Sequence, residues 1–241
     1  MTHTTPSTTR RSVLTTIAAG SLAVAGCTDS ASTGLPGAGD ISRVDVAGTE
    51  LVVEYDAETS ATGLTVIAPS GETFAERQLT PGASQETIPI GTAYPPGTYT
   101  VQLVDEQSVV AAVEQSLRPD VVIREVKLGR NHPEEMYEGA GGLTVTGEAI
   151  VTVENVGTGP EKLTELHFDG DVPRPTPDDL SESGIAAVDQ PVTYTEPVVN
   201  SGETRTIFSM TLPFGASSDV VSCTPDGTSG QFVVRISGRV G

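Results

Sequence analysis

The feature that most limits how this chain can fold is the alternation of apolar and polar residues in short runs. Apolar residues recur at every second position, as in Leu51, Val53 and Tyr55 and again in Leu64 and Val66. A period of two places successive side chains on opposite faces of an extended strand. No stretch shows a convincing 3.6-residue period, which an amphipathic helix would have. We therefore predict an all-β protein.

The first β region covers residues 40–118 and is predicted to be an Ig-like β-sandwich. Its seven alternating runs, with turn signals between them, lie at residues 44–46, 51–55, 64–68, 73–79, 88–90, 99–103 and 109–117. The stretch from Pro95 to Leu103 resembles the penultimate strand of extracellular Ig-like and fibronectin-like modules. Tyr99 in it is placed to form a tyrosine corner. The cysteine pair and the strand-C tryptophan of antibody domains are absent.

The second β region is predicted over residues 119–241, after a boundary at Arg118-Pro119-Asp120. Proline disfavours a helical conformation at the residue before it. Alternation places Leu143, Val145, Ala149, Val151 and Val153 on one face of an expected strand. Further runs follow at residues 166–168, 207–212 and 231–240. The prediction is therefore two tandem Ig-like β-sandwich domains.

Part of this second region resembles a CARDB-type (cell-adhesion-related) domain. The resemblance rests first on a strand that ends in Asn155-Val156-Gly157, within residues 151–159, and on the run at 163–168 that follows it. It rests also on the later segment 201–206, which begins Ser-Gly-Glu-Thr. It covers roughly residues 145–214. It implies an extracellular seven-stranded sandwich used in adhesion or as a spacer, and carries over no functional residue. A Pro-rich insert at residues 172–197 departs from the family pattern.

The N-terminus reads as an export signal followed by a tether. Arg10 and Arg11 precede a short apolar run that ends in Ala-Val-Ala-Gly before Cys27. This is the order of a secretory signal, and paired arginines mark the route that exports folded proteins. The last five residues resemble a lipobox, which implies a lipidated Cys27. We expect a twin-arginine signal peptide at residues 1–26 and a lipidated, flexible tether at 27–39. The alternative is an uncleaved membrane anchor, although the 15-residue apolar run at 12–26 is shorter than the roughly 20 residues of a span.

The charge of the chain is strongly acidic. Removing residues 1–26 would leave 11 basic residues against all 32 acidic ones, so the net charge would go from −19 to −21. The only lysines are Lys127 and Lys162. This composition resembles that of salt-loving archaeal proteins, whose carboxylates repel little at molar salt. It argues against nucleic acid or anionic lipid headgroups as partners. Capture of a cationic ligand stays an alternative to a solvated halophilic surface.

Two long loops, at residues 129–142 and 172–197, are the expected recognition sites. Binding residues are frequent on loops that a rigid scaffold holds. Because both loops contribute little apolar pattern, we expect that trimming them costs the fold little. The alternative is that a strand lies hidden around residues 185–192.

Residues with metal-ligating side chains gather at two places. His132, Glu134 and Glu135 lie in the first loop, and His167, Asp169 and Asp171 alternate near the end of a predicted strand. Neither group fits a complete calcium loop, and acidic clusters arise by chance in so acidic a chain. We therefore expect no metal and no cofactor.

The remaining chemistry gives no sign of catalysis. Cys223 is expected to be a small buried apolar residue, with an intermolecular disulfide as the alternative. The chain has no nucleophile-elbow, phosphate-loop or dinucleotide motif and no tryptophan for stacking on sugars. We expect a protein that is not an enzyme.

We expect a lipid-anchored binding or structural, adhesion-like module on the extracytoplasmic face of the cell membrane. Its partners would be the membrane, through Cys27, and a surface protein or glycan. The alternatives are a calcium-dependent carbohydrate-binding lipoprotein and an accessory subunit of a membrane complex.

The acidic composition predicts a salt-dependent stability. The melting temperature should fall as salt is lowered from molar to about 0.1 M, because the Debye length grows from about 3 to 10 Å and the carboxylates repel one another. Calorimetry across a salt series checks this. A melting temperature that stays constant over the series would contradict the halophilic interpretation.

Overall fold

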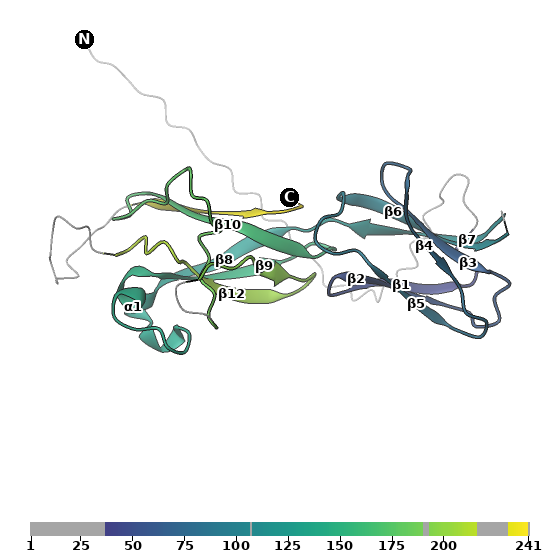
Figure 1. The fold of residues 1–241 in the computed structure, drawn as a ribbon, viewed down its shortest axis with the longest axis horizontal. Coiled ribbons are helices and arrows are strands. Elements are labelled where there is room, and N and C mark those ends of the chain that lie inside the picture. The colour runs from purple at the N-terminus through teal and green to yellow at the C-terminus, as the bar shows by residue number, and fades with distance from the viewer. Residues whose placement is uncertain (1–36, 107, 190–192, 216–230, 241) are drawn as a thin grey trace, which may run out of the picture. The chain divides into compact units, whose positions relative to one another are not determined.

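The computed structural model describes residues 37–106, 108–189, 193–215 and 231–240 (Figure 1). The regular secondary structure of the described residues is almost entirely antiparallel β-strand, so the all-β prediction is confirmed. Arg10, Arg11, Cys27 and Cys223 lie outside the described residues. The apolar side chains gather in two main hydrophobic clusters, one within residues 41–117 and one within 149–214.

Strands β1–β7 form what we call the N-terminal sandwich. Its two sheets have the strand orders β1-β2-β5 and β4-β3-β6-β7. The strands are β1 (Ile41–Ala47), β2 (Glu50–Tyr55), β3 (Gly63–Ile67), β4 (Thr73–Gln78), β5 (Gln85–Pro89), β6 (Gly97–Asp105) and β7 (Ser108–Leu117). Each of the seven predicted runs coincides with one of these strands.

The core of the N-terminal sandwich is built from alternate residues of these strands. Leu51 and Val53 of β2 and Val101 of β6 are fully buried in it. The ring of Tyr99 is also buried, and its hydroxyl donates to the carbonyl oxygen of Pro95 at 2.8 Å. This bond to a backbone oxygen shortly upstream is the tyrosine-corner geometry predicted for Tyr99.

Strands β8–β13 form the C-terminal sandwich, with sheets of order β12-β9-β8 and β11-β10-β13. The strands are β8 (Val121–Leu128), β9 (Ala149–Asn155), β10 (Glu161–Gly170), β11 (Val198–Val199), β12 (Thr204–Phe208) and β13 (Phe232–Gly238). Between β8 and β9 lie the 3-10 helices η1 (Gly129–Asn131) and η2 (Pro133–Glu135) and the short helix α1 (Leu143–Gly147).

The strand expected to begin at Leu143 begins instead at Ala149. Residues 143–147 form α1, and Leu143 is 76% exposed rather than part of the core. The chain enters this turn at Gly142, whose φ of +54° favours glycine. The run expected through residue 212 is also shorter, since β12 ends at Phe208 and Leu212 has a φ of +51°.

The Pro-rich insert is built into the C-terminal sandwich rather than free of it. Ile185 is 1% exposed and forms an isolated β-bridge with Ser209. The side-chain oxygen of Thr176 accepts a bond from the Phe168 N–H, and the Leu166 N–H donates to the Ser183 carbonyl. The insert therefore bonds to β10 and to the segment after β12. The alternative of hidden β-structure near residue 185 is correct in part, and these contacts argue against the expectation that the insert can be trimmed at little cost.

One buried side chain, that of Asn155 at the end of β9, bonds to four backbone groups in three segments of the chain. Its amide nitrogen donates to the carbonyl oxygens of Gly159 (2.8 Å) and Val199 (2.9 Å). Its side-chain oxygen accepts from the N–H groups of Asp120 (3.1 Å) and Gly157 (3.0 Å). Both donors and both lone pairs of a completely buried amide are thus used.

The segments that Asn155 joins also bond directly to one another. The Thr158 N–H donates to the Arg118 carbonyl at 2.7 Å, and the Val156 N–H donates to the Asp120 carbonyl at 2.8 Å. At Gly157 a Cβ atom would collide with the backbone of residues 118–120. The predicted boundary at 118–120 is therefore a hydrogen-bonded junction and not a loose linker.

Replacing Asn155 by Ala should destabilise the protein by about 3 kcal/mol or more. The change leaves two buried carbonyls and two partly buried N–H groups without this partner, and each unsatisfied buried group costs roughly 1–3 kcal/mol before relaxation. Chemical denaturation at constant high salt measures the loss. Asn131→Ala, at an exposed position, is the matched control and should stay within about 0.5 kcal/mol of wild type. An Asn155→Ala protein as stable as this control would contradict the role given to Asn155.

Candidate functional site

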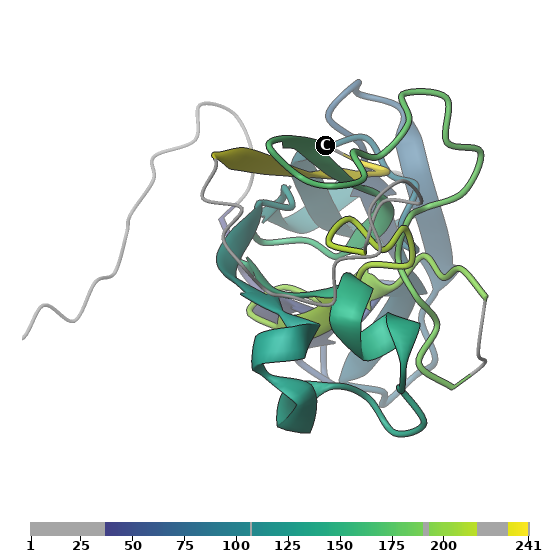
Figure 2. The same ribbon diagram turned by 90° about the vertical axis from the view of Figure 1, so that its left-hand side faces the viewer.

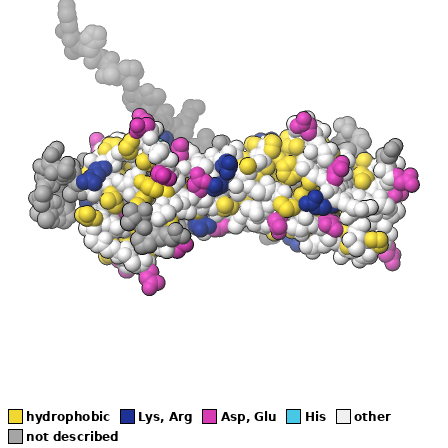
Figure 3. All heavy atoms as spheres, viewed as in Figure 1, with side chains coloured by type: hydrophobic (Ala, Val, Ile, Leu, Met, Phe, Trp, Pro, Cys, Tyr) yellow, Lys and Arg dark blue, Asp and Glu magenta, His cyan; other side chains and the backbone are white. Residues whose placement is uncertain are grey.

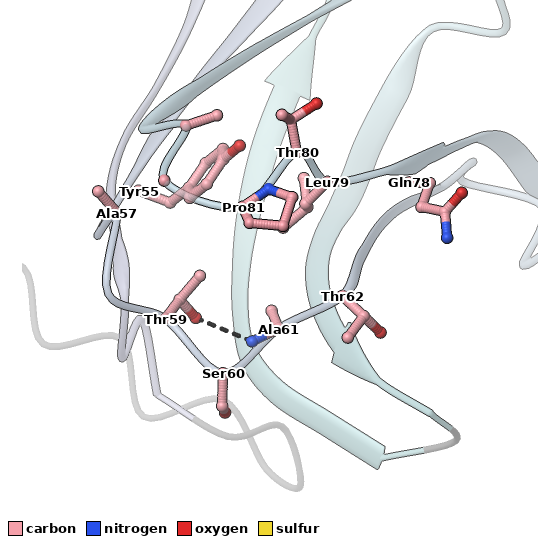
Figure 4. Close-up of a pocket in the computed structure, with 12 residues that line it drawn as sticks. Tyr55, Ala57, Thr59, Ser60, Ala61, Thr62, Gln78, Leu79, Thr80 and Pro81 are labelled. Carbon is pink, nitrogen blue, oxygen red and sulfur yellow. Dashed lines mark hydrogen bonds between the residues drawn. The ribbon is translucent and has the colours of Figure 1, made fainter.

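A hollow of about 590 Å³ opens between the loops that follow β2 and β4 (Figure 4). We call it the loop pocket. It is lined by Tyr55, Ala57, Thr59, Ser60, Ala61, Thr62, Gln78, Leu79, Thr80, Pro81, Gly82 and Ala83. Its volume lies in the range of small-molecule sites, roughly 300–1,000 Å³.

Local hydrogen bonds fix both loops of the pocket. The Thr59 hydroxyl donates to Asp40 at 2.6 Å and accepts from the Ala61 N–H at 3.2 Å. On the opposite side, the Ala83 N–H donates to the Thr80 carbonyl at 3.0 Å across a turn. Proline 81 and a glycine at φ +81° occupy the two central positions of that turn, which is the sequence of a type II turn. The pocket walls are therefore preformed.

Tyr55 at the end of β2 forms the deepest polar part of the pocket. The residue is 4% exposed, and its hydroxyl is buried with no hydrogen-bond partner among the described residues. Figure 4 shows the ring reaching toward the side of the pocket formed by Thr80 and Pro81. Burial, and secondarily the Glu86 carboxylate, raise the pKa of Tyr55. The hydroxyl therefore stays protonated and can donate a hydrogen bond.

The lining of the loop pocket is uncharged, which sets it apart from the surface around it. Carboxylates are scattered over the face of the molecule seen in Figure 3, with fewer basic groups among them. None of the twelve lining residues carries a charge, whereas hydroxyls of serine and threonine and the Gln78 amide reach it. Such a surface suits a neutral ligand with several hydroxyl groups.

The predicted loop at 172–197 lines a second hollow, of about 660 Å³. Its walls carry Glu165, Glu182 and Glu196 against Lys162. Lys162 pairs with Glu196, and this bond lowers the pKa of the Glu196 carboxyl. The hollow is consequently acidic, and its remaining carboxylates favour cationic groups.

The other predicted loop, at 129–142, mainly covers the core. Met136 and Tyr137 pack against a small cluster of Ile150, Ala186 and Phe208, and the rings of Tyr137 and Phe208 stand edge to face at 4.9 Å. Figure 2 shows the helical turns of this region lying against the strands. These apolar contacts hold part of the loop against the core, and its role in recognising a partner stays a prediction.

The two predicted groups of metal-ligating residues do not meet. His132, Glu134 and Glu135 bring ligand atoms within 4.8 Å of one another, but Lys127 already donates to both oxygens of Glu135 at 2.8 and 3.0 Å. These contacts lower the pKa of the Glu135 carboxyl and hold it as an ion pair.

The residues of the second group have partners of their own. His167 lies 3.4 Å from Glu165, Asp169 pairs with Arg235, and Asp171 accepts from the Gln231 N–H. This arrangement gives no metal cage at the end of β10.

Glu148, between α1 and β9, is a buried carboxyl that the sequence interpretation missed. The residue is 2% exposed. One carboxyl oxygen accepts from the Tyr137 hydroxyl at 3.3 Å, and the other has no partner among the described residues. Burial raises the pKa of Glu148 to about 7, against a smaller opposite effect of the Tyr137 bond. It lines neither hollow, so its protonation bears on the packing of the 129–142 segment.

The loop pocket was also missed. Tyr55 has the alternation of a core residue, and it does lie in the core. The segment at 57–62 contains threonine and serine, and its sequence has no pattern that marks it as more than a connection between two strands. Only the pairing of β2 with β5 and of β3 with β4 brings this segment near the turn at 80–83.

Comparisons with known proteins find solved structures of low similarity. No family model matches the chain, and no curated protein matches it. Among solved structures, a β-glucuronidase from glycoside hydrolase family 2 is similar at 8% identity and a TM-score of 0.24, over 80% of this chain and 19% of that one. A glycosyl hydrolase family 2 member from Bacteroides cellulosilyticus is similar at 12% identity and a TM-score of 0.22, over 80% and 23%. The chain thus spans about a fifth of the length of these enzymes. Within its described residues, no helix is long and apolar enough to cross a membrane.

The raised pKa of Glu148 predicts that the folded state loses stability as the pH rises from about 4.5 to about 7. In that window the folded protein holds a proton that the unfolded chain releases, so raising the pH favours unfolding. Glu148→Gln should remove this slope and be more stable than wild type near pH 8, by up to about 3 kcal/mol. Chemical denaturation at several pH values measures the free energy of unfolding of both proteins. Glu134→Gln, at an exposed position, is the control and should keep the pH dependence of wild type. A Glu148→Gln protein with the wild-type pH dependence of stability would contradict the raised pKa given to Glu148.

Proposed function

We propose that this chain is a non-catalytic structural, adhesion-like module, held by a lipid at Cys27 on the extracytoplasmic face of the cell membrane. The observation that carries the proposal is that buried polar side chains form their hydrogen bonds with backbone groups. Asn155 forms all four of its side-chain hydrogen bonds with backbone groups around the 118–120 junction. Such a side chain serves to fix segments of chain and has no capacity left for a ligand.

Other buried polar side chains of the C-terminal sandwich do the same. The Glu161 carboxylate accepts from the N–H groups of Arg239 at 2.8 Å and Val240 at 3.0 Å. The Ser209 hydroxyl accepts from the Ala149 N–H at 2.8 Å. These bonds are directed at backbone, as expected of a module whose task is to keep its form. Glu148, His167 and Thr211 are exceptions, because each has a buried polar atom without a hydrogen-bond partner among the described residues.

The membrane location rests on the sequence. The paired arginines, the short apolar run and the small residues before Cys27 support export and lipidation. A single acyl chain binds membranes only marginally, so stable anchoring calls for two chains on this residue or a second contact. A surface protein or glycan partner is part of the same proposal.

Membrane fractionation tests the anchor. Cys27→Ser should move the protein from the membrane to the extracytoplasmic soluble fraction, because the thiol that would carry the lipid is gone. Cys223→Ser, which removes the other cysteine of the chain, is the matched control and should remain with the membrane. Retention of Cys27→Ser at wild-type level would contradict the lipid anchor.

The adhesion role is tested on cells. Cells that display the wild-type chain should bind one another or a glycan-coated surface more than cells without it. Crosslinked pull-down from native membranes at high salt would identify the partner. Wild-type binding by cells that lack the chain would contradict an adhesive role.

A further inference from the structure

We propose that the loop pocket binds a neutral, polyhydroxylated ring of the hexopyranose type. This goes beyond the structural role proposed above and does not depend on it. The starting observation is the Tyr55 hydroxyl, which is buried at the pocket with no hydrogen-bond partner among the described residues. A buried hydroxyl without a partner is costly, and a ligand hydroxyl placed in the pocket would satisfy it.

The contrast with Tyr99 shows that the unpaired state is particular to Tyr55. Both rings belong to the same core cluster and both are almost fully buried. The Tyr99 hydroxyl is paired with the Pro95 carbonyl, as is usual for a buried tyrosine. Tyr55 lines the pocket instead, and its hydroxyl is the buried group there that has a hydrogen bond still to donate.

The rest of the lining selects the class of ligand. Ser60, Thr62, Thr80 and Gln78 offer both donors and acceptors at the pocket, and no lining residue offers a charge. Leu79 and Pro81 add an apolar surface beside these groups. A pyranose presents the matching pattern, with hydroxyls at its edge and C–H groups on its faces. A carboxylated sugar would meet no cation in the lining and an acidic protein around it.

Binding in this pocket also needs no metal ion. Thr59 and the turn at 80–83 are fixed by protein hydrogen bonds, so an ion is not required to order them. The cluster of His132, Glu134 and Glu135 belongs to the other sandwich and lines neither hollow. Sugar binding here would therefore resist a chelator.

Saturation-transfer NMR on the full chain at molar salt tests the proposal, with D-glucose, D-galactose and D-mannose as probes and D-glucuronate as the charged comparison. At least one neutral hexose should receive saturation, and glucuronate should receive less. Addition of EDTA should leave the signal unchanged. Loss of the signal with EDTA would overturn the proposal in favour of a metal-dependent site.

Two tyrosine variants separate binding from stability. Tyr55→Phe should weaken hexose binding about threefold to tenfold, the effect of one neutral hydrogen bond, and leave the melting temperature unchanged or higher. Tyr99→Phe, the matched control, should bind normally and melt at a lower temperature. Ser60→Trp, at an exposed lining position, should block the pocket and abolish binding, which keeps the test valid if Tyr55→Phe fails to fold.

Three further outcomes would overturn the proposal. They are the absence of transfer to every neutral hexose, wild-type affinity in a folded Tyr55→Phe, and wild-type affinity in Ser60→Trp. The first would mean that no neutral hexose reaches the pocket. None of them bears on anchoring by Cys27 or on adhesion through a protein partner, so failure here is distinguishable from failure of the proposed function.

Discussion

The hydrogen bonds of the Asn155 side chain are the interaction on which the rest of the structure depends. A peptide-like amide buried without partners costs several kcal/mol, but one whose donors and acceptors are all used becomes a precise junction. Asn155 sits where β9 ends, where the 118–120 segment arrives and where β11 passes. No other side chain of similar size offers two donors and an acceptor oxygen on so short a stem. The strands on either side take their positions from this point.

Most of the β-structure could be predicted because alternation is a strong signal over five residues or more. All seven strands of the N-terminal sandwich lie where the pattern placed them, and Tyr99 makes its expected backbone bond. The pattern failed where the chain leaves regular structure. Leu143 and Val145 continue the alternation of β9, yet two preceding glycines allow a tight turn that becomes α1. An alternating pattern does not show where a strand begins when a short helix precedes it in the sequence.

The candidate sites were harder to predict because they depend on contacts between distant segments. Tyr55 and the turn at 80–83 are apart in sequence, and only the strand pairing brings them together. The insert at 172–197 looked like a free loop since proline and polar residues dominate it. A few residues, Ile185 among them, bind it to the sheets. Glu148 was one carboxyl among many, and nothing in the sequence marks it as the buried one.

The strand pairing of the C-terminal sandwich bears on when it can fold. β10 pairs with β13, so that Leu163 meets Gly238, and β9 pairs with β12 on the far side of the insert. Pairings this distant in sequence have a high loop-closure cost and form slowly. β13 is synthesised after the other described strands of this sandwich, so chains made only as far as β12 would show an open edge on β10. Under the export proposed above from the paired arginines, this edge would have to close before the chain crosses the membrane.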